Sequence, residues 1–194
     1  GWMQYRDERK LTPDQIALID RWVADGMPRG DQSKEPAPPI FADDWLLGNS
    51  GDNNITGTAN GDFFMLQQGG NDTATGLGGN DIFYFGAAFG TLDQVDGAGG
   101  TDTVALQGVY ASLTIGAHGL DNIESFAFLS HTDTRFGGAT ASPNSYDITM
   151  DDGNVAAGQR LIVNASLLQS GENFTFNGAA ETDGKLFVYA GAGT

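Results

Sequence analysis

The 194-residue sequence contains no cysteine, only 9 lysine and arginine residues, and no long run of apolar residues. The absence of cysteine excludes disulfide bonds, thiolate metal sites and covalent haem attachment through this chain. Because no stretch of 18 apolar residues occurs, we expect no membrane-spanning helix. With a formal charge of −16, the chain would be repelled by phosphate groups, which argues against nucleic acid and anionic lipid as partners.

Acidic residues and glycine are abundant instead. The chain has 25 aspartate and glutamate residues and 29 glycines, and the glycine share is about twice the usual one. Between residues 41 and 110 there are nine acids and no lysine or arginine. Such a segment repels itself when it becomes compact, so we expect a cation as its partner. Its apolar residues, such as Phe64 and Phe83, indicate that it nevertheless folds around a core.

A nonapeptide repeat runs through this acidic segment. It reads GNSGDNNIT from Gly48, GTANGDFFM from Gly57, QQGGNDTAT from Gln67, GLGGNDIFY from Gly76 and GAGGTDTVA from Gly97. Each copy is a polar, glycine-containing turn followed by three residues that alternate like a short strand. The sixth position holds Asn53, Asp62, Asp72, Asp81 and Asp102.

These nonapeptides resemble the RTX, or haemolysin-type, calcium-binding repeats. The resemblance implies a right-handed parallel β-roll, in which two nonapeptides make one coil and Ca²⁺ binds between turns stacked on the same edge. Repeat one then stacks on repeat three, which pairs Asn53 with Asp72, and repeat two on repeat four, which pairs Asp62 with Asp81. Ca²⁺ takes six to eight oxygen ligands, so main-chain oxygens are expected to complete the shell. The carbonyls expected to do so are those of Gly57, Ala59, Gly70 and Gly79.

The resemblance therefore predicts two or more bound Ca²⁺ ions. Asn53 offers a neutral oxygen, so the first site is expected to be the weaker one. A 12-residue insertion, FGAAFGTLDQVD at 85–96, precedes the fifth repeat, and its Asp93 and Asp96 are candidates to join Asp102.

Alternation within the strands predicts two different outer faces. Position eight of each repeat points into the core, and positions seven and nine point outward. In repeats one and three the outward residues are polar, whereas in repeats two and four they are Phe63, Met65, Ile82 and Tyr84. Apolar faces of this kind are seldom left bare. We therefore predict that the N-terminal helix or another protein chain covers this one.

Residues 111–194 carry further strand-like runs between turns of variable length. A continued β-solenoid fits them best, an immunoglobulin-like sandwich is the alternative, and the segment resembles regions between repeat blocks of long RTX exoproteins. The final AGAGT resembles the truncated opening of another repeat. The predicted strands are Leu113–Ile115, Ile123–Leu129, Tyr146–Met150, Leu161–Ala165, Phe174–Asn177 and Leu186–Tyr189.

Residues 1–40 differ in composition from the rest. Thr12, a proline after it and Gln15 form a capping box that predicts a helix ending near Gly26, before a proline-rich linker. The segment LTPDQIALIDRWVADGMPRGD resembles the last helix of bacterial c-type cytochrome domains, in which a methionine near the position of Met3 is a haem ligand. The Cys-x-x-Cys-His motif that would attach haem is absent.

The sequence thus predicts a mainly β protein in three parts: a helix and linker at 1–40, a calcium-binding β-roll at 41–110 and a solenoid continuation at 111–194. We expect a non-catalytic structural module, since His118 and His131 have no nucleophile near them in the sequence. The RTX resemblance implies type I secretion and a place outside, or on the surface of, a Gram-negative cell. Two alternatives remain: the secretion and stability part of a larger exoenzyme, and an accessory subunit of an electron-transfer complex.

Overall fold

The computed structural model of the chain describes residues 12–26 and 45–192. The chain divides into two compact units, 1–40 and 41–194. In the first, helix α1 (Pro13–Ala24) begins with the predicted capping box: the Thr12 hydroxyl accepts the Gln15 N–H at 3.3 Å, and the Gln15 side chain accepts the Thr12 N–H at 2.9 Å. The expected linker, Met3 and the last two residues of the expected truncated repeat lie outside the described residues.

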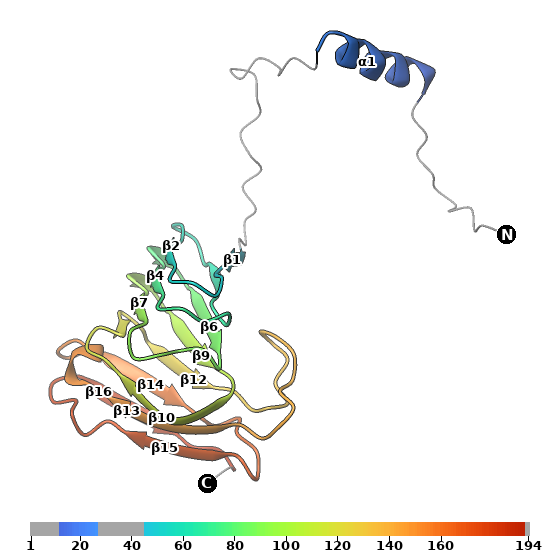
Figure 1. Cartoon of the computed structure of the whole chain (residues 1–194). Coiled ribbons are helices and arrows are strands. Elements are labelled where there is room, and N and C mark those ends of the chain that lie inside the picture. Colours follow the sequence, from blue (N-terminus) through green and yellow to red (C-terminus); the bar gives the residue numbers. More distant parts are fainter. Residues whose placement is uncertain (1–11, 27–44, 193–194) are drawn as a thin grey trace. The chain divides into compact units, whose positions relative to one another are not determined.

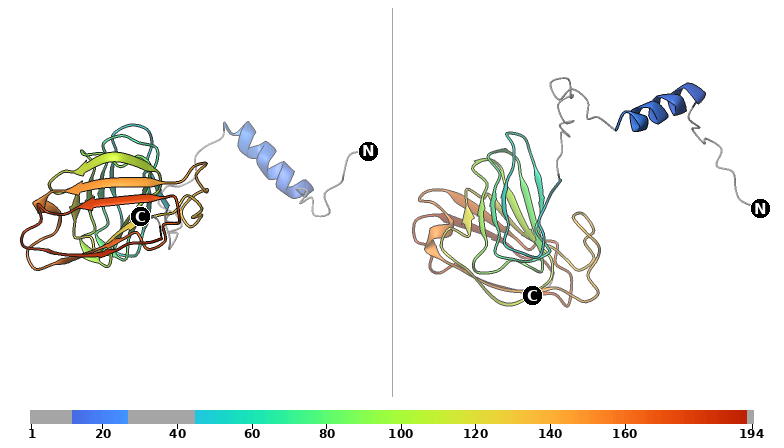
Figure 2. Two further views of the ribbon diagram at one scale, coloured as in Figure 1. Left: turned by 90° about the horizontal axis from the view of Figure 1, so that it is seen from below. Right: turned by 45° about the horizontal axis from the view of Figure 1, so that its top comes forward.

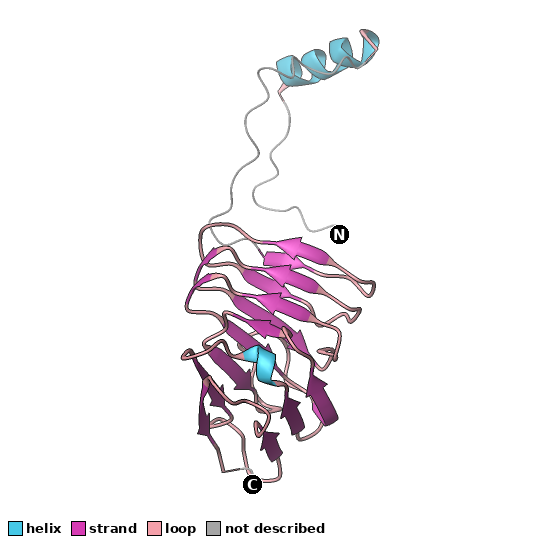
Figure 3. Ribbon diagram, turned by 90° about the vertical axis from the view of Figure 1, so that its left-hand side faces the viewer, coloured by secondary structure: helices cyan, strands magenta, loops and turns pink. Residues whose placement is uncertain are grey.

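The second unit is a stack of parallel strands whose chain passes repeatedly from one sheet to another (Figures 1 and 3). Every strand in the first sheet pairs in parallel with its neighbours. In spatial order this first sheet consists of β1 (Trp45–Leu47), β3 (Phe63–Met65), β6 (Ile82–Gly86), β9 (Thr103–Leu106), β12 (Ser125–Phe128), β14 (Arg160–Asn164) and β16 (Lys185–Tyr189).

The strands between those of the first sheet form the other sides of the coils (Figure 2). All of them also pair in parallel. The second sheet contains β2 (Asn54–Thr56), β4 (Thr73–Thr75), β7 (Gln94–Asp96) and β11 (Leu120–Asp121). The third contains β10 (Val109–Ile115), β13 (Ser145–Met150) and β15 (Asn173–Asn177), while β5 (Gly78–Gly79) pairs with β8 (Gly99–Gly100) and η2 (Asp152–Asn154) is a 3₁₀ turn.

This topology confirms the predicted fold class, a mainly β, solenoid-like protein with one N-terminal helix. An immunoglobulin-like sandwich is built from antiparallel strands, so parallel pairing throughout 111–194 rules it out. Within the described residues, no helix is long and apolar enough to cross a membrane.

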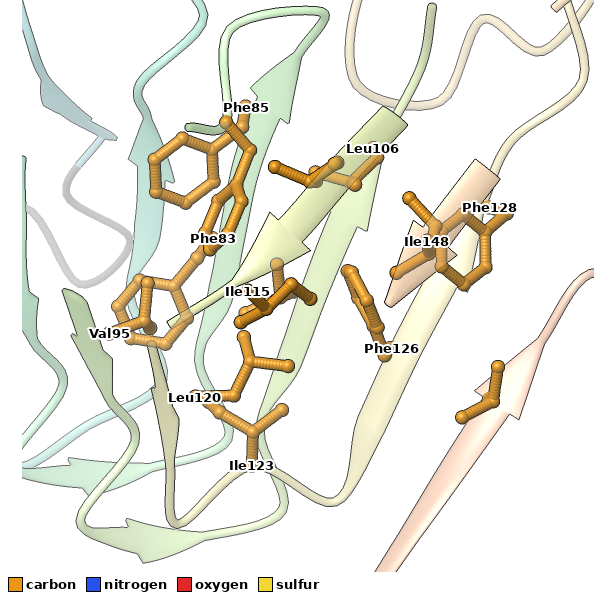
Figure 4. Close-up of a cluster of buried hydrophobic side chains, with 14 of the residues drawn as sticks. Phe83, Phe85, Val95, Leu106, Ile115, Leu120, Ile123, Phe126, Phe128 and Ile148 are labelled. Atoms are coloured by element: carbon orange, nitrogen blue, oxygen red, sulfur yellow. The ribbon is translucent and has the colours of Figure 1, made fainter. Parts of the chain in front are cut away.

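The core is made from the eighth positions of the repeats, as the period-two alternation predicts. Phe64 of β3 is in register with Phe83 of β6, which is in register with Val104 of β9, and all three are fully buried. The rings of Phe64 and Phe83 stack with their centroids 4.4 Å apart. The same cluster continues beyond residue 110 through side chains such as Phe126 and Ile148 (Figure 4), so repeats and continuation share one hydrophobic core.

Part of the apolar outer face is covered by a loop of the same unit. Met65 and Tyr84 are buried, and they pack with Leu129 and with Phe136 from the connection between β12 and β13. The Phe136 ring lies 5.5 Å from that of Phe63 and 5.7 Å from that of Tyr84. A loop of the same unit therefore covers Met65 and Tyr84, whereas Phe63 and Ile82 stay partly exposed, and their cover by the N-terminal helix or another chain stays a prediction.

We expect Phe136→Ala to loosen this cover. The side chain is only partly buried, so the loss of stability should be about 1–2 kcal/mol, roughly half the value of a fully buried phenylalanine. Thermal unfolding would measure the loss, and limited proteolysis should cut more readily near residue 136. Phe187→Ala is the matched control, since that side chain is 44% exposed. Equal effects of the two substitutions would contradict the covering role.

Candidate metal centre

One ladder of acidic side chains runs along the turns that lead into the first sheet. It consists of Asp62, Asp81, Asp102 and Glu124, and we call it the Asp62 ladder. The main-chain N–H of Asp62 donates to Oδ1 of Asp81 at 2.7 Å, and that of Asp81 donates to Oδ1 of Asp102 at 2.7 Å. The N–H of Asp102 donates in turn to Oε2 of Glu124 at 2.8 Å. Each coil therefore provides the acceptor for the coil before it.

A second ladder runs along the turns that lead into the second sheet. In this Asp72 ladder, the N–H of Asn53 donates to Oδ1 of Asp72 at 3.0 Å, and the N–H of Asp72 donates to Oδ1 of Asp93 at 2.6 Å. The parallel register explains both ladders. Each ladder residue comes immediately before a strand, and strands such as β2 and β4 pair without an offset from Asn54↔Thr73 onward.

The ladder carboxylates are buried without cationic partners. Relative exposure is 5% for Asp62, 2% for Asp72 and Asp93, and 1% for Asp81 and Asp102. In the described part of the chain, no lysine or arginine forms an ion pair with any of these five residues. Buried charges are costly unless they are paired or bind a metal ion, so these carboxyl groups require protons or cations to balance them.

Burial shifts the titration of these groups. It raises the pKa of Asp72, Asp81 and Asp93, although the N–H donors of the neighbouring coil act in the opposite direction. For Asp102, burial raises the pKa from 3.8 to about 6, and the charges of Asp81, Glu124 and Asp96 add to that effect. A positive ion among these carboxylates would reverse the shift because it favours the charged form.

Two carboxylate oxygens of the ladders stand out. Oδ2 of Asp62 accepts the Thr58 N–H at 2.6 Å, and Oδ2 of Asp93 accepts the Gly90 N–H at 2.6 Å. By contrast, Oδ2 of Asp81 and Oδ2 of Asp102 are buried and have no hydrogen-bond partner among the described residues. An unpartnered buried oxygen in an acidic environment fits a bound cation.

Glycine residues lie at the positions where a Cβ atom would collide with the carboxylate oxygens of the ladders. Gly57, Gly76 and Gly97 each precede a ladder aspartate by five residues. A Cβ on Gly57 would lie 2.6 Å from Oδ2 of Asp62 and 2.8 Å from the Gly76 carbonyl oxygen of the next coil. At Gly76, a Cβ would contact Oδ2 of Asp81 and lie 3.0 Å from the Gly97 carbonyl oxygen. Carboxylate and carbonyl oxygens thus meet at each position, which is the donor set that Ca²⁺ prefers.

The structure brings most of the predicted side chains together. Asn53 stacks with Asp72, and Asp62 stacks with Asp81. Asp93 lies beside Asp72 rather than Asp102, because the insertion carries it to the other edge of the coil. Asp96 belongs to β7, where its Oδ1 accepts the Ala98 N–H at 2.9 Å and the Asn122 side-chain amide at 2.8 Å.

The main-chain carbonyls that the resemblance predicts as Ca²⁺ ligands have surroundings that differ from one to the next. The Ala59 oxygen faces Gly78, and the Gly79 oxygen contacts Gly100 in the stacked turn of the next coil. Gly70 adopts a φ of +117° and lies against the backbone of Gly51, where a Cβ would not fit. Whether any of these residues, or Gly57, binds a metal ion stays a prediction.

Sequence reasoning missed the Gly76 and Gly97 carbonyls, whereas the sequence did offer Glu124, together with Asp121, as a further oxygen site. The glycine five residues before each ladder aspartate was a usable signal for the two carbonyls. Another group it missed is Asp152, Glu181 and Asp183, whose carboxylate oxygens lie within 4.8 Å of one another at the surface. Glu181 there accepts the Gly184 N–H at 2.7 Å through Oε1, and Asp152 accepts the Thr182 N–H at 2.7 Å. Oε2 of Glu181 is buried and has no hydrogen-bond partner among the described residues, so loop contacts account for only part of this group.

The fold and the two ladders together define the class of this protein: it is a parallel β-roll with buried aspartate ladders. Comparison with known proteins finds no matching family model, no matching curated protein and no matching solved structure. The resemblance to RTX repeats therefore depends on the nonapeptides and on this geometry alone.

Proposed function

We propose that the chain is a calcium-binding structural module of the RTX type, whose roll is stabilised by Ca²⁺. The observation that carries the proposal is the pair of buried, unpartnered oxygens of Asp81 and Asp102 within an acidic ladder. Main-chain oxygens of Gly76 and Gly97 lie close by. All of these groups are hard oxygen donors, which favours Ca²⁺ over softer transition metals.

In this proposal the ladder aspartates and the stacked turn carbonyls hold the ions, and the bound Ca²⁺ supplies the positive charge that the segment lacks. Glycine-rich turns lose much conformational entropy on folding, and the carboxylates repel one another. Binding therefore contributes directly to the free energy of folding. The module has no catalytic role of its own.

We further propose that the module works outside the cell or at the cell surface of a Gram-negative bacterium, after type I secretion. The RTX resemblance of the nonapeptides supports this location. The absence of cysteine is compatible with it, because the fold does not depend on disulfide bonds. Folding would then follow the rise in Ca²⁺ concentration on export.

Circular dichroism during a Ca²⁺ titration tests the proposal. The wild type should gain thermal stability with Ca²⁺, together with any β signal that is missing in chelator, but not with equal Mg²⁺, since Mg²⁺ demands a smaller octahedral site. The double variant Asp62→Ala/Asp81→Ala should lose most of this response. Asp147→Ala, a change at an exposed site on β13, should keep it. A wild type that is fully folded in chelator and indifferent to Ca²⁺ would overturn the proposal.

A further inference from the structure

The last step of the Asp62 ladder lies outside the nonapeptide repeats. Residues 121–124 read Asp-Asn-Ile-Glu and contain none of the repeat glycines. They nevertheless stack on the turn of the fifth repeat. The Gly97 N–H donates to the Asp121 carbonyl at 3.0 Å, and the Glu124 N–H donates to the Asp102 carbonyl at 3.2 Å.

Asn122 gives this turn its shape. Its φ is +50°, a left-handed conformation that asparagine tolerates better than most residues. The Asn122 carbonyl oxygen is directed at Gly97, and a Cβ on Gly97 would contact that oxygen while lying 2.5 Å from Oδ2 of Asp102. The two oxygens therefore face the same small space.

Oδ2 of Asp102 borders that space, and two further carboxyl groups lie near it. Asp102 is 1% exposed, and its Oδ2 has no hydrogen-bond partner in the described chain. Glu124 extends from the next coil and accepts the Asp102 N–H through Oε2 at 2.8 Å. The side-chain amide of Asn122 donates to Oδ1 of Asp96 at 2.8 Å and holds Asp96 nearby. A surface pocket whose lining includes Ala98, Asn122, Glu124 and Arg160 lies beside this turn.

We propose that the 121–124 turn ends the Asp62 ladder with a divalent-cation site of its own, in which Oδ2 of Asp102, the Asn122 carbonyl and the Glu124 carboxylate bind the ion and Asp96 adds negative charge. The inference rests on the proposed function, because it requires the ladder to bind Ca²⁺. It adds a site that the repeat pattern does not encode. The ion would join the last repeat turn to the first coil of the continuation.

The test is the number of Ca²⁺ ions bound per chain, measured by equilibrium dialysis and calorimetry with CaCl₂. Glu124→Gln removes the charge but keeps an oxygen that can accept the Asp102 N–H. We expect it to bind one ion fewer, or to bind one ion at least tenfold more weakly. Glu124→Asp, which keeps the charge on a side chain one methylene shorter, should still bind this ion but more weakly than the wild type. Asp147→Asn, which removes an exposed charge on β13, should bind like the wild type.

The outcomes separate the two proposals. If the wild type binds no Ca²⁺, the proposed function fails and this inference fails with it. If the wild type binds Ca²⁺ and Glu124→Gln binds the same number with equal affinity, only the terminal site is refuted. Circular dichroism in excess Ca²⁺ checks that each variant is folded. If Glu124→Gln does not fold, Glu124→Asp decides, because a carboxylate one methylene shorter should weaken one ion selectively.

Discussion

Replacing Asp81 by asparagine is expected to stabilise the metal-free protein and to remove much of its stabilisation by Ca²⁺. Asparagine keeps an oxygen that can accept the Asp62 N–H, now at 2.7 Å from Oδ1 of Asp81. It removes the charge associated with an oxygen that is buried without a partner. Relief of that unpaired group should raise the free energy of unfolding in chelator by about 1–3 kcal/mol.

In excess Ca²⁺ the variant should lose this advantage, and the order of stability reverses where its gain in chelator is smaller than the contribution of the bound ion. A site occupied at 100 times its dissociation constant contributes about 2.7 kcal/mol of stability, and the variant should lose most of it at this site. Urea unfolding in chelator and in excess Ca²⁺ measures both effects. Asp147→Asn removes the same charge from an exposed position and should behave like the wild type in both buffers. If the Asp81→Asn variant is less stable than the wild type in chelator, the charge of Asp81 does not destabilise the metal-free protein.

Acidification is expected to stabilise the metal-free protein between pH 7 and pH 5. The pKa of Asp102 rises from 3.8 to about 6 on folding, because the group is buried among other carboxylates. The folded protein therefore holds a proton that the unfolded chain releases. Stability from this group is fully present below pH 3.8 and is lost as the pH rises through about 6. Between pH 7 and pH 5 the protonated fraction of Asp102 in the folded protein rises about tenfold. This increases the free energy of unfolding by about 1.4 kcal/mol through this residue alone.

The raised pKa values of Asp72, Asp81 and Asp93 add to the trend in the same direction. Glu172 acts oppositely at lower pH. Its burial would raise its pKa, but N–H donors from Gln169 and His131 outweigh this and lower the pKa to about 2. Stability from Glu172 is thus present above pH 4.5 and lost as the pH falls toward 2, so it leaves the interval from 7 to 5 unchanged.

Thermal unfolding in chelator across this interval checks the prediction. Asp102→Asn should flatten the pH dependence, whereas Asp147→Asn should retain it. In excess Ca²⁺ the trend should reverse, because protons then compete with the ion for the same oxygens. A melting temperature that falls steadily from pH 7 to 5 in chelator would contradict the raised pKa values.

Much of the fold was readable from the sequence because its repeats force one geometry. A period of two in each short strand determines which residues enter the core, and Phe64 and Phe83 lie where that period places them. The pairings of Asn53 with Asp72 and of Asp62 with Asp81 follow from an equal coil length of 19 residues. The helix start at Thr12 depends only on local hydrogen bonds.

The remainder depends on contacts between distant segments, which a repeat does not encode. Residues 85–96 take the place of a nonapeptide as half a coil and contain β7, and only the folded coil shows that Asp93 then lies beside Asp72. Glu124 follows Asp102 by 22 residues in a turn of different sequence. Phe136 is a single aromatic residue within a polar connection, so its packing on Tyr84 had no periodic signal.

The direction of the ladder hydrogen bonds has a consequence for how such a protein changes in length. Within a ladder, an inner residue such as Asp81 donates its main-chain N–H to a side chain of the following coil, and its own carboxylate accepts an N–H from the coil before it. Successive steps of a ladder therefore have the same hydrogen-bonding pattern. A whole additional coil placed between two existing ones would leave every donor with an acceptor. One extra nonapeptide would instead carry Asp81 to the edge of the Asp72 ladder and exchange the sheets of all later strands. The coil, rather than the nonapeptide, is therefore the unit by which this architecture can be lengthened or shortened.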